Sequence, residues 1–453
     1  MKTLLRWFIF VVLGLAVLVA LFYAEEDWRG WHAWQKCKAE LEAKGAVLDW
    51  DKYIPPPVPD DQNFFKAPKM TDWFVRNNDP TKTGLPALGT NKVTNATNLD
   101  ESIAANYLAW SDQFQPDFDL MREALKRPYA RMEGDYSIPY QIPIPNFVAL
   151  RTFAQVLAKR AQCDLLLGQP DKALQELTLM HDMCRLLEAA PSGKPMTLVA
   201  AMINVAVAWL YVDTIAPALQ SHAWQEPQLV ALQRQLAEIH LNPQVLSALK
   251  EEPAGLCRTA QITWIPKLFD VTAKMNWSDK IRWWLWPRGW TYQNMVNVAV
   301  LQQKPLEGFD LAHDIIAPRK FAEASREIDK FFRHMSPYKL LATIAIPNYG
   351  RAFQTTAHNQ TMVNEAQIVC ALERYRLAHT EYPATLDALS PQFIDKIPHD
   401  IIGGQPLIYH PTADGKILLY SIGWNETDDG GGDSPKTENG GADYSLGDWV
   451  WKY

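Results

Sequence analysis

The sequence predicts a mainly α-helical protein with a small α+β domain at its C-terminus and a membrane helix at its N-terminus. Three observations support this prediction. An uncharged apolar run follows the first few residues, apolar residues recur at helical spacing from about 99 to 334, and two strand-like segments flank an Asp-Gly turn near residue 414. We expect a membrane anchor over 1–24, a juxtamembrane helix and proline-rich spacer over 25–98, an α-helical domain over 99–345, and an α+β domain over 346–453.

The composition is that of a folded protein without a general affinity for nucleic acid. Hydrophobic residues make up 48% of the 453 residues, and 44 basic against 51 acidic residues give a formal net charge of -7. A polyanionic partner is therefore disfavoured. The five cysteines are dispersed and odd in number, so they predict neither a disulfide framework nor a metal site.

The N-terminus predicts a single membrane crossing. Lys2 and Arg6 precede an uncharged run over 7–24, and three acidic residues follow it directly. A helix over this run rises about 27 Å, close to the thickness of a bilayer core. Basic residues on the N-terminal side place that end in the cytoplasm, so we expect the bulk of the chain outside it, periplasmic or extracytoplasmic. A cleaved signal peptide is the alternative, although Phe22 and Leu18 disfavour cleavage after Ala24 or Ala20.

The next segment predicts a second stretch of helix and then a spacer. Trp28, Trp31 and Trp34 recur at three-residue spacing, which fits either the membrane headgroup layer or a face packed on the body. The proline-rich run over 53–61 interrupts any helix, because each proline fixes its own backbone and favours an extended predecessor.

The helical body is clearest over 148–187, where two amphipathic helices flank a turn. Gly168 suits the end of the first helix and Pro170 the first turn of the second. The turn weakly resembles that of tetratricopeptide hairpins, with Ala161 and Ala173 where that repeat has small residues, but without its large aromatics or a clean recurrence. We expect irregularly stacked helical pairs, either as a structural bundle or with a peptide groove. The apolar run over 196–212 predicts a buried core helix, because it is short and has Asn204 near its middle.

A search for catalytic motifs finds no phosphate-binding loop, zinc-protease motif or nucleophile elbow. Acid pairs at helical spacing, Glu251 with Glu252 and Glu323 with Glu327, are typical of solvated faces or ion pairs. An enzyme would need a site assembled from distant segments.

The C-terminal segment predicts a helix followed by strands. Apolar residues from Ala366 to Leu377 line one side of a helix, which the proline after Tyr382 ends. Strands are expected over 406–410 and 417–421, joined by the Asp-Gly turn.

The order of these elements resembles the C-terminal domain of the major pseudopilin of type II secretion systems. The resemblance covers about 364–453 and rests on an ordered series: a helix ending Leu-Glu-Arg-Tyr-Arg-Leu-Ala-His, then Glu-Tyr-Pro, Pro-His-Asp, Gly-Gly-Gln-Pro-Leu-Ile-Tyr, Leu-Tyr-Ser-Ile-Gly and an acidic glycine-rich loop.

The resemblance implies a calcium site in that loop. Carried onto this sequence, the ligands are the carbonyl of Ile422, the side chain of Asn425, acids among Asp428, Asp429 and Asp433, and Asp448. Calcium takes about six to eight oxygen ligands, which glycine-spaced carboxylates can supply. Asn425 stands where the family usually has Asp, and the loop carries an insertion over 430–442. A solvated loop without an ion is the alternative.

The N-terminus departs from the pseudopilin pattern. The apolar run lacks the glutamate that follows the family's leader, and more than 300 residues separate it from the similar domain. We therefore expect a non-enzymatic, membrane-anchored interaction or assembly factor with an envelope protein as partner and calcium as ligand. The alternatives are an extracytoplasmic hydrolase with a composite site in the helical body, and a divergent pseudopilin.

Overall fold

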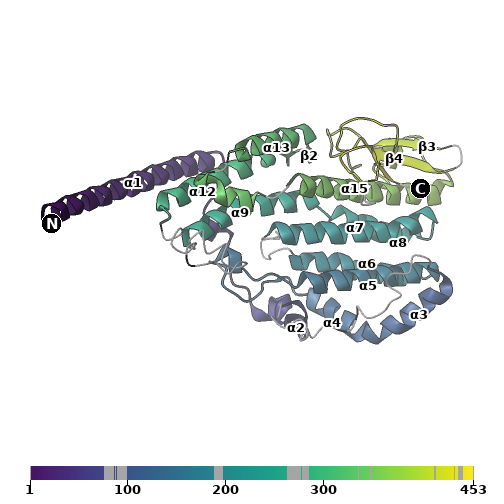
Figure 1. The fold of residues 1–453 in the computed structure, drawn as a ribbon. Coiled ribbons are helices and arrows are strands. Elements are labelled where there is room, and N and C mark those ends of the chain that lie inside the picture. The colour runs from purple at the N-terminus through teal and green to yellow at the C-terminus, as the bar shows by residue number, and fades with distance from the viewer. Residues whose placement is uncertain are drawn as a thin grey trace.

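The computed structural model has a long N-terminal helix, a layered helical body and a small sheet at the end far from the N-terminus (Figure 1). It describes residues 2–75, 86, 88, 99–187, 197–262, 277, 285–334, 336–346, 349–412, 415–432, 434–436 and 442–451. The helices are α1 (Lys2–Ala43), α2 (Met70–Phe74), α3 (Glu101–Ser111), α4 (Gln115–Leu125), α5 (Phe147–Leu166), α6 (Pro170–Met183), α7 (Leu198–Gln220), α8 (Glu226–Ala237), α9 (Leu241–Ile262), α12 (Arg288–Gln303), α13 (Pro318–Phe332), α14 (Leu340–Ala345) and α15 (Tyr349–His379). The strands are β1 (Phe309–Asp310), β2 (Ile315–Ile316), β3 (Ile408–Pro411), β4 (Ile417–Ser421) and β5 (Trp449–Trp451). The mainly α-helical fold with a small α+β region is thus confirmed.

Helix α1 joins the predicted anchor and the juxtamembrane helix in one element of 42 residues. Thr3–Ala43 is long and apolar enough to cross a membrane, and its most apolar window has 0% of its residues buried. Trp28 and Trp31 are exposed, whereas Trp34 is buried in the body. Packing on the body, one of the two alternatives, therefore applies to Trp34 and not to Trp28 or Trp31.

The residues on either side of the proline-rich run pack into the body. Trp50 is buried and donates its indole N–H to the carbonyl of Tyr136 at 2.8 Å. Phe64 and Phe74 lie in the main core, with ring centroids 5.7 Å apart. Their apolar area outweighs the local preference of the prolines for an extended, solvated chain.

Helices α5 and α6 form the predicted hairpin. Gly168 takes a left-handed backbone with φ of 68°, where a side chain would be strained, and Pro170 is the first residue of α6. Ala161 and Ala173 are both fully buried where the two helices meet. The small side chains allow this close packing.

Helix α7 also has the length and apolarity of a membrane span, but 56% of its window is buried inside the protein. It packs against α5, α9 and α15. This arrangement agrees with the prediction of a core helix.

Helix α15 is the centre of the half of the body far from the N-terminus and contacts α7, α8, α9 and β5 (Figure 1). The largest core cluster includes side chains from α5 to α8, α15 and the sheet. The boundary predicted near residue 345 therefore does not separate two cores. The C-terminal segment 364–453 shares its core with the helical body instead of packing as a separate module.

The C-terminal sheet is antiparallel with the order β3-β4-β5. Ile408 pairs with Tyr420 across β3 and β4, and Leu419 pairs with Trp451 across β4 and β5. The first two strands match the predicted hairpin, whereas β5 was not predicted. This third strand brings two indoles against α15.

Candidate functional site

The Gly/Asp-rich loop is organised around Asp448, one of the predicted calcium ligands. Its carboxylate is buried and accepts the backbone N–H groups of Asp429 at 3.1 Å and Gly431 at 2.7 Å. Burial raises the pKa of Asp448 above its ordinary value. Asp448 thus holds the loop against β5 by hydrogen bonds.

Three other residues of the predicted ligand set form hydrogen bonds within the protein. Asp428 accepts the hydroxyl of Tyr420 at 3.1 Å, and Asn425 donates its amide to Asp429 at 2.9 Å. The backbone N–H of Ile422 donates to Asp400 at 3.2 Å.

Asp433, the remaining predicted ligand, lies outside the described residues. Among those the structure does describe, no three His, Cys, Asp or Glu side chains are grouped closely enough to hold a metal ion. Calcium binding by this loop therefore stays a prediction.

Calcium dependence of stability tests it on the full chain, because α15 shares its core with the body. If the loop binds calcium, the melting temperature should be higher in saturating calcium than in chelator. At a free calcium concentration a hundredfold above Kd, the free energy of unfolding should rise by about 2.7 kcal/mol. Asp428→Asn should reduce the shift, whereas Asp329→Asn on α13 should not. Identical melting across millimolar calcium would remove the assignment.

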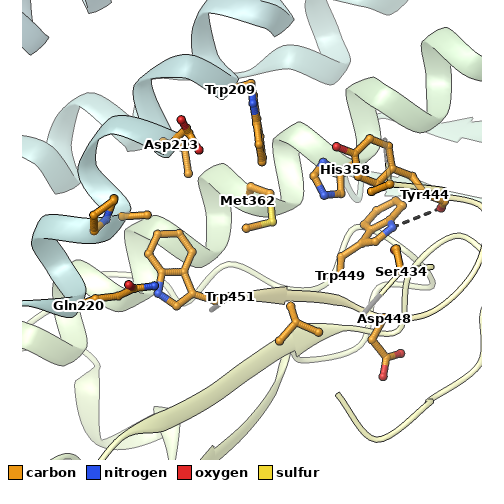
Figure 2. A pocket seen from close by; sticks show the side chains of 15 residues that line it. Trp209, Asp213, Gln220, His358, Met362, Ser434, Tyr444, Asp448, Trp449 and Trp451 are labelled. Atoms are coloured by element: carbon orange, nitrogen blue, oxygen red, sulfur yellow. Dashed lines mark hydrogen bonds between the residues drawn. The ribbon is translucent and has the colours of Figure 1, made fainter. Parts of the chain in front are cut away.

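An aromatic cavity lies beside this loop, between α7, α15 and β5. It encloses about 410 Å³. Figure 2 shows Trp209 and Asp213 on α7, His358 and Met362 on α15, and Trp449 and Trp451 from the sheet around one space. Three elements that are far apart in sequence build this site.

His358 is at the centre of the ring cluster. Its ring stacks on Tyr444 with centroids 3.8 Å apart and lies 5.4 Å from Trp449 and 5.5 Å from Trp209. Burial lowers the pKa of His358 to about 4, so the ring is neutral at pH 7.

Hydrogen bonds assign the tautomer of His358. Asn359 donates its side-chain amide to the carbonyl of Val205 at 3.0 Å, which leaves its side-chain oxygen as an acceptor. That oxygen lies 3.1 Å from Nδ1 of His358, so Nδ1 carries the proton and Nε2 is the acceptor nitrogen.

A second cavity of about 600 Å³ lies on another side of α15 and has both apolar and polar side chains in its lining. Its lining includes His240, His313 and His399. Nε2 of His399 lies 3.1 Å from the carbonyl oxygen of Asp314, and Nδ1 of His313 lies 2.8 Å from Asp310. The lining described by the structure has no Ser, Thr or Cys, so these histidines have no neighbouring hydroxyl or thiol nucleophile there.

Local sequence patterns could not identify the aromatic cavity. Trp209 and Asp213 are four residues apart on a helix predicted to be core, and His358 precedes the segment with the pseudopilin resemblance. The one local signal was the Trp-Val-Trp ending, whose alternation puts two indoles on one face of a strand.

Comparison with protein-family models, curated proteins and solved structures finds no match for this chain.

Proposed function

We propose that this chain is a non-enzymatic binding or assembly factor of the bacterial envelope, anchored in the inner membrane by the first half of α1 with its body in the periplasm. The proposal rests on the difference between the two halves of α1. Side chains such as Leu4, Phe10 and Leu18 are more than half exposed, while the second half of the same helix is fastened to the body.

The contacts between α1 and the body begin immediately after the apolar run. Glu26 is 7% exposed and accepts the indole N–H of Trp290 at 3.0 Å. Asp27 accepts the backbone N–H of Gly289 at 2.7 Å. These acidic side chains lie near the N-terminus of α12, where the helix dipole favours negative charge.

The backbones of α1 and α12 cross at two glycines. A Cβ atom added to Gly289 would lie 1.9 Å from the carbonyl oxygen of Glu26, and one added to Gly30 would lie 2.3 Å from that of Gly289. Only glycine permits this approach, so the body is held directly against the base of the apolar segment rather than on a flexible linker.

Charge supports the direction of insertion. Lys2 and Arg6 precede the apolar run, and Glu25, Glu26 and Asp27 follow it. Positive residues favour the cytoplasmic side, which puts the body outside. The pseudopilin resemblance of 364–453 favours an envelope partner in assembly, and the aromatic cavity favours a binding role.

Cysteine labelling tests the topology. Four of the five native cysteines are buried, so background labelling is low. A membrane-impermeant maleimide should label Val148→Cys, a 66% exposed site on the body, in cells with a permeabilised outer membrane. The matched Thr3→Cys variant should label only after lysis.

Alkaline extraction tests the anchor. The full chain should stay with membranes, and a chain lacking 2–24 should become soluble while keeping its helical circular dichroism spectrum. Labelling of Thr3→Cys without lysis would reverse the orientation, and release of the full chain by alkali would reject the anchor.

A further inference from the structure

The aromatic cavity has the size and position of a small-molecule site. Its volume of about 410 Å³ falls in the range of about 300–1,000 Å³ typical of ligand pockets. It lies in the half of the body that is far from the N-terminal end of α1 (Figure 1). A ligand would therefore enter from the aqueous side rather than from the bilayer around the anchor.

Aromatic rings line the cavity from three sides. Trp209 comes from α7, Trp449 and Trp451 come from β5, and Tyr444 lies in the segment before that strand (Figure 2). Trp209 is 37% exposed and stands at the opening, whereas Trp449 and Trp451 are buried. The faces of such rings attract cations, with tryptophan the strongest.

The charges of the lining favour a positive ligand. Asp213 and Asp448 are the acidic residues of the described lining, which has no Lys or Arg, but the carboxylate of Asp448 points away from the cavity (Figure 2). Asp448 is held by the loop amides, so Asp213 is the carboxylate at the opening. Within the described part of the chain no basic side chain pairs with Asp213, and partial burial raises its pKa above the ordinary value.

Two buried polar groups in the lining have no hydrogen-bond partner among the residues that the structure describes. They are the indole N–H of Trp451, which is 2% exposed, and the hydroxyl of Ser434. An unmet buried donor costs about 1–3 kcal/mol, which a ligand oxygen would recover. Nε2 of His358 offers the complementary acceptor for a ligand hydroxyl.

We propose that this cavity binds a small organic cation, an alkylated ammonium that also carries a hydroxyl or carbonyl oxygen. The ammonium group lies between Trp209 and Trp449 with Asp213 beside it, and the oxygen lies toward the indole N–H of Trp451 (Figure 2). The proposal rests on the proposed binding function and names the class of its ligand.

A comparison of choline with its uncharged isostere 3,3-dimethylbutan-1-ol distinguishes the effect of ligand charge on affinity from the effect of ligand shape. With the full chain in an uncharged detergent, we expect choline to quench tryptophan fluorescence saturably and to bind about 5- to 20-fold more tightly than the isostere, as cation–π attraction of this strength implies. Calorimetry should give the same ratio. Equal affinities would overturn the cation assignment, as would no binding of choline at tens of millimolar.

Variants locate the site. Asp213→Asn and Trp209→Leu should each weaken choline binding about 5- to 20-fold and leave binding of the isostere nearly unchanged, whereas Trp209→Phe retains a ring and should lose less. Asp329→Asn, an exposed aspartate on α13, is the matched control. Unchanged choline affinity in both Asp213→Asn and Trp209→Leu, with normal melting curves, would overturn the assignment of this cavity.

Nanodiscs identify the source of the cation. Choline binding that weakens in phosphatidylcholine discs but not in phosphatidylglycerol discs would assign a lipid headgroup, and equal binding would assign a free ligand. Both results support recognition of the ammonium group. Failure of choline to bind would leave the labelling and extraction results intact, so it is distinguishable from failure of the proposed topology.

Discussion

Replacing Glu176 by alanine is expected to lower the free energy of unfolding by about 3–5 kcal/mol, because it leaves a buried guanidinium without its main counter-charge. Arg160 on α5 is 5% exposed, and Glu176 on α6 is 4% exposed. Nε of Arg160 donates to Glu176 at 2.9 Å. At this burial the loss of one partner costs more than a surface ion pair would.

The same guanidinium joins the hairpin to the preceding helices. Arg160 also donates to the hydroxyl of Ser111 at 2.6 Å and to Asp112 at 2.9 Å, at the junction of α3 and α4. Arg122 on α4 donates to the second oxygen of Glu176 at 3.2 Å. Loss of Glu176 therefore loosens the packing of α4 as well as that of α5 on α6.

Urea unfolding followed by tryptophan fluorescence measures the effect. Glu123→Ala is the control, because Glu123 is 70% exposed in its pair with Lys126, and we expect a change within about 0.5 kcal/mol. The double variant Arg160→Met/Glu176→Leu should recover most of the loss, since apolar pairs often replace buried ion pairs. If Glu176→Ala lowers the free energy of unfolding by less than about 1 kcal/mol, the remaining partners of Arg160 are enough to stabilise its buried charge.

The parts of the fold that the sequence predicted are those encoded by local periodicity. The α5–α6 hairpin follows from two amphipathic stripes and the residues Gly168 and Pro170, and α1 follows from one uncharged run. The strands β3 and β4 follow from alternation around an Asp-Gly turn. Each signal lies within about twenty residues of chain.

Long-range packing could not be predicted in this way. Residues 50–75 have the prolines of a spacer, yet they fold onto helices more than fifty residues later, where Trp50 and Phe64 are buried. The sharing of α15 between the sheet and the helical body likewise depends on which faces of distant helices meet. Nothing local distinguishes a helix buried on several sides from one that supports a sheet alone.

The candidate site likewise has one part that the sequence could predict and one part that it could not. The acidic loop could be located from composition, but Asp448 is used to hold backbone amides, a role that depends on β5. The cavity brings together Trp209, His358 and Trp449, whose spacing in the chain has no motif. Such a site becomes visible only when the helices are placed in space.

Replacing Glu365 by methionine is expected to stabilise the protein at neutral pH by on the order of 1–3 kcal/mol, the cost of a buried polar group without a partner. Glu365 on α15 is fully buried, and neither carboxyl oxygen has a hydrogen-bond partner within the described part of the chain. Methionine has a similar length and favours a helix. The backbone amide of Ser421 is near, but its geometry falls short of a hydrogen bond.

The pH dependence of this gain distinguishes a titrating carboxyl from simple repacking. Burial, with the charge of Asp400 adding to it, raises the pKa of Glu365 well above its ordinary 4.5 in the folded protein. The folded state therefore retains a proton that the unfolded chain releases above pH 4.5, and the native protein loses stability as the pH rises from there toward the folded-state pKa. Since methionine does not titrate, the gain should be smallest near pH 4.5 and grow with pH.

Melting temperatures from pH 4.5 to 9 test this expectation against Glu381→Met, a substitution at an exposed glutamate beyond the end of the same helix. The control should shift stability by less than about 0.5 kcal/mol at every pH. A Glu365→Met variant that is less stable than the native protein at pH 8 would mean that the buried carboxyl makes a favourable contact.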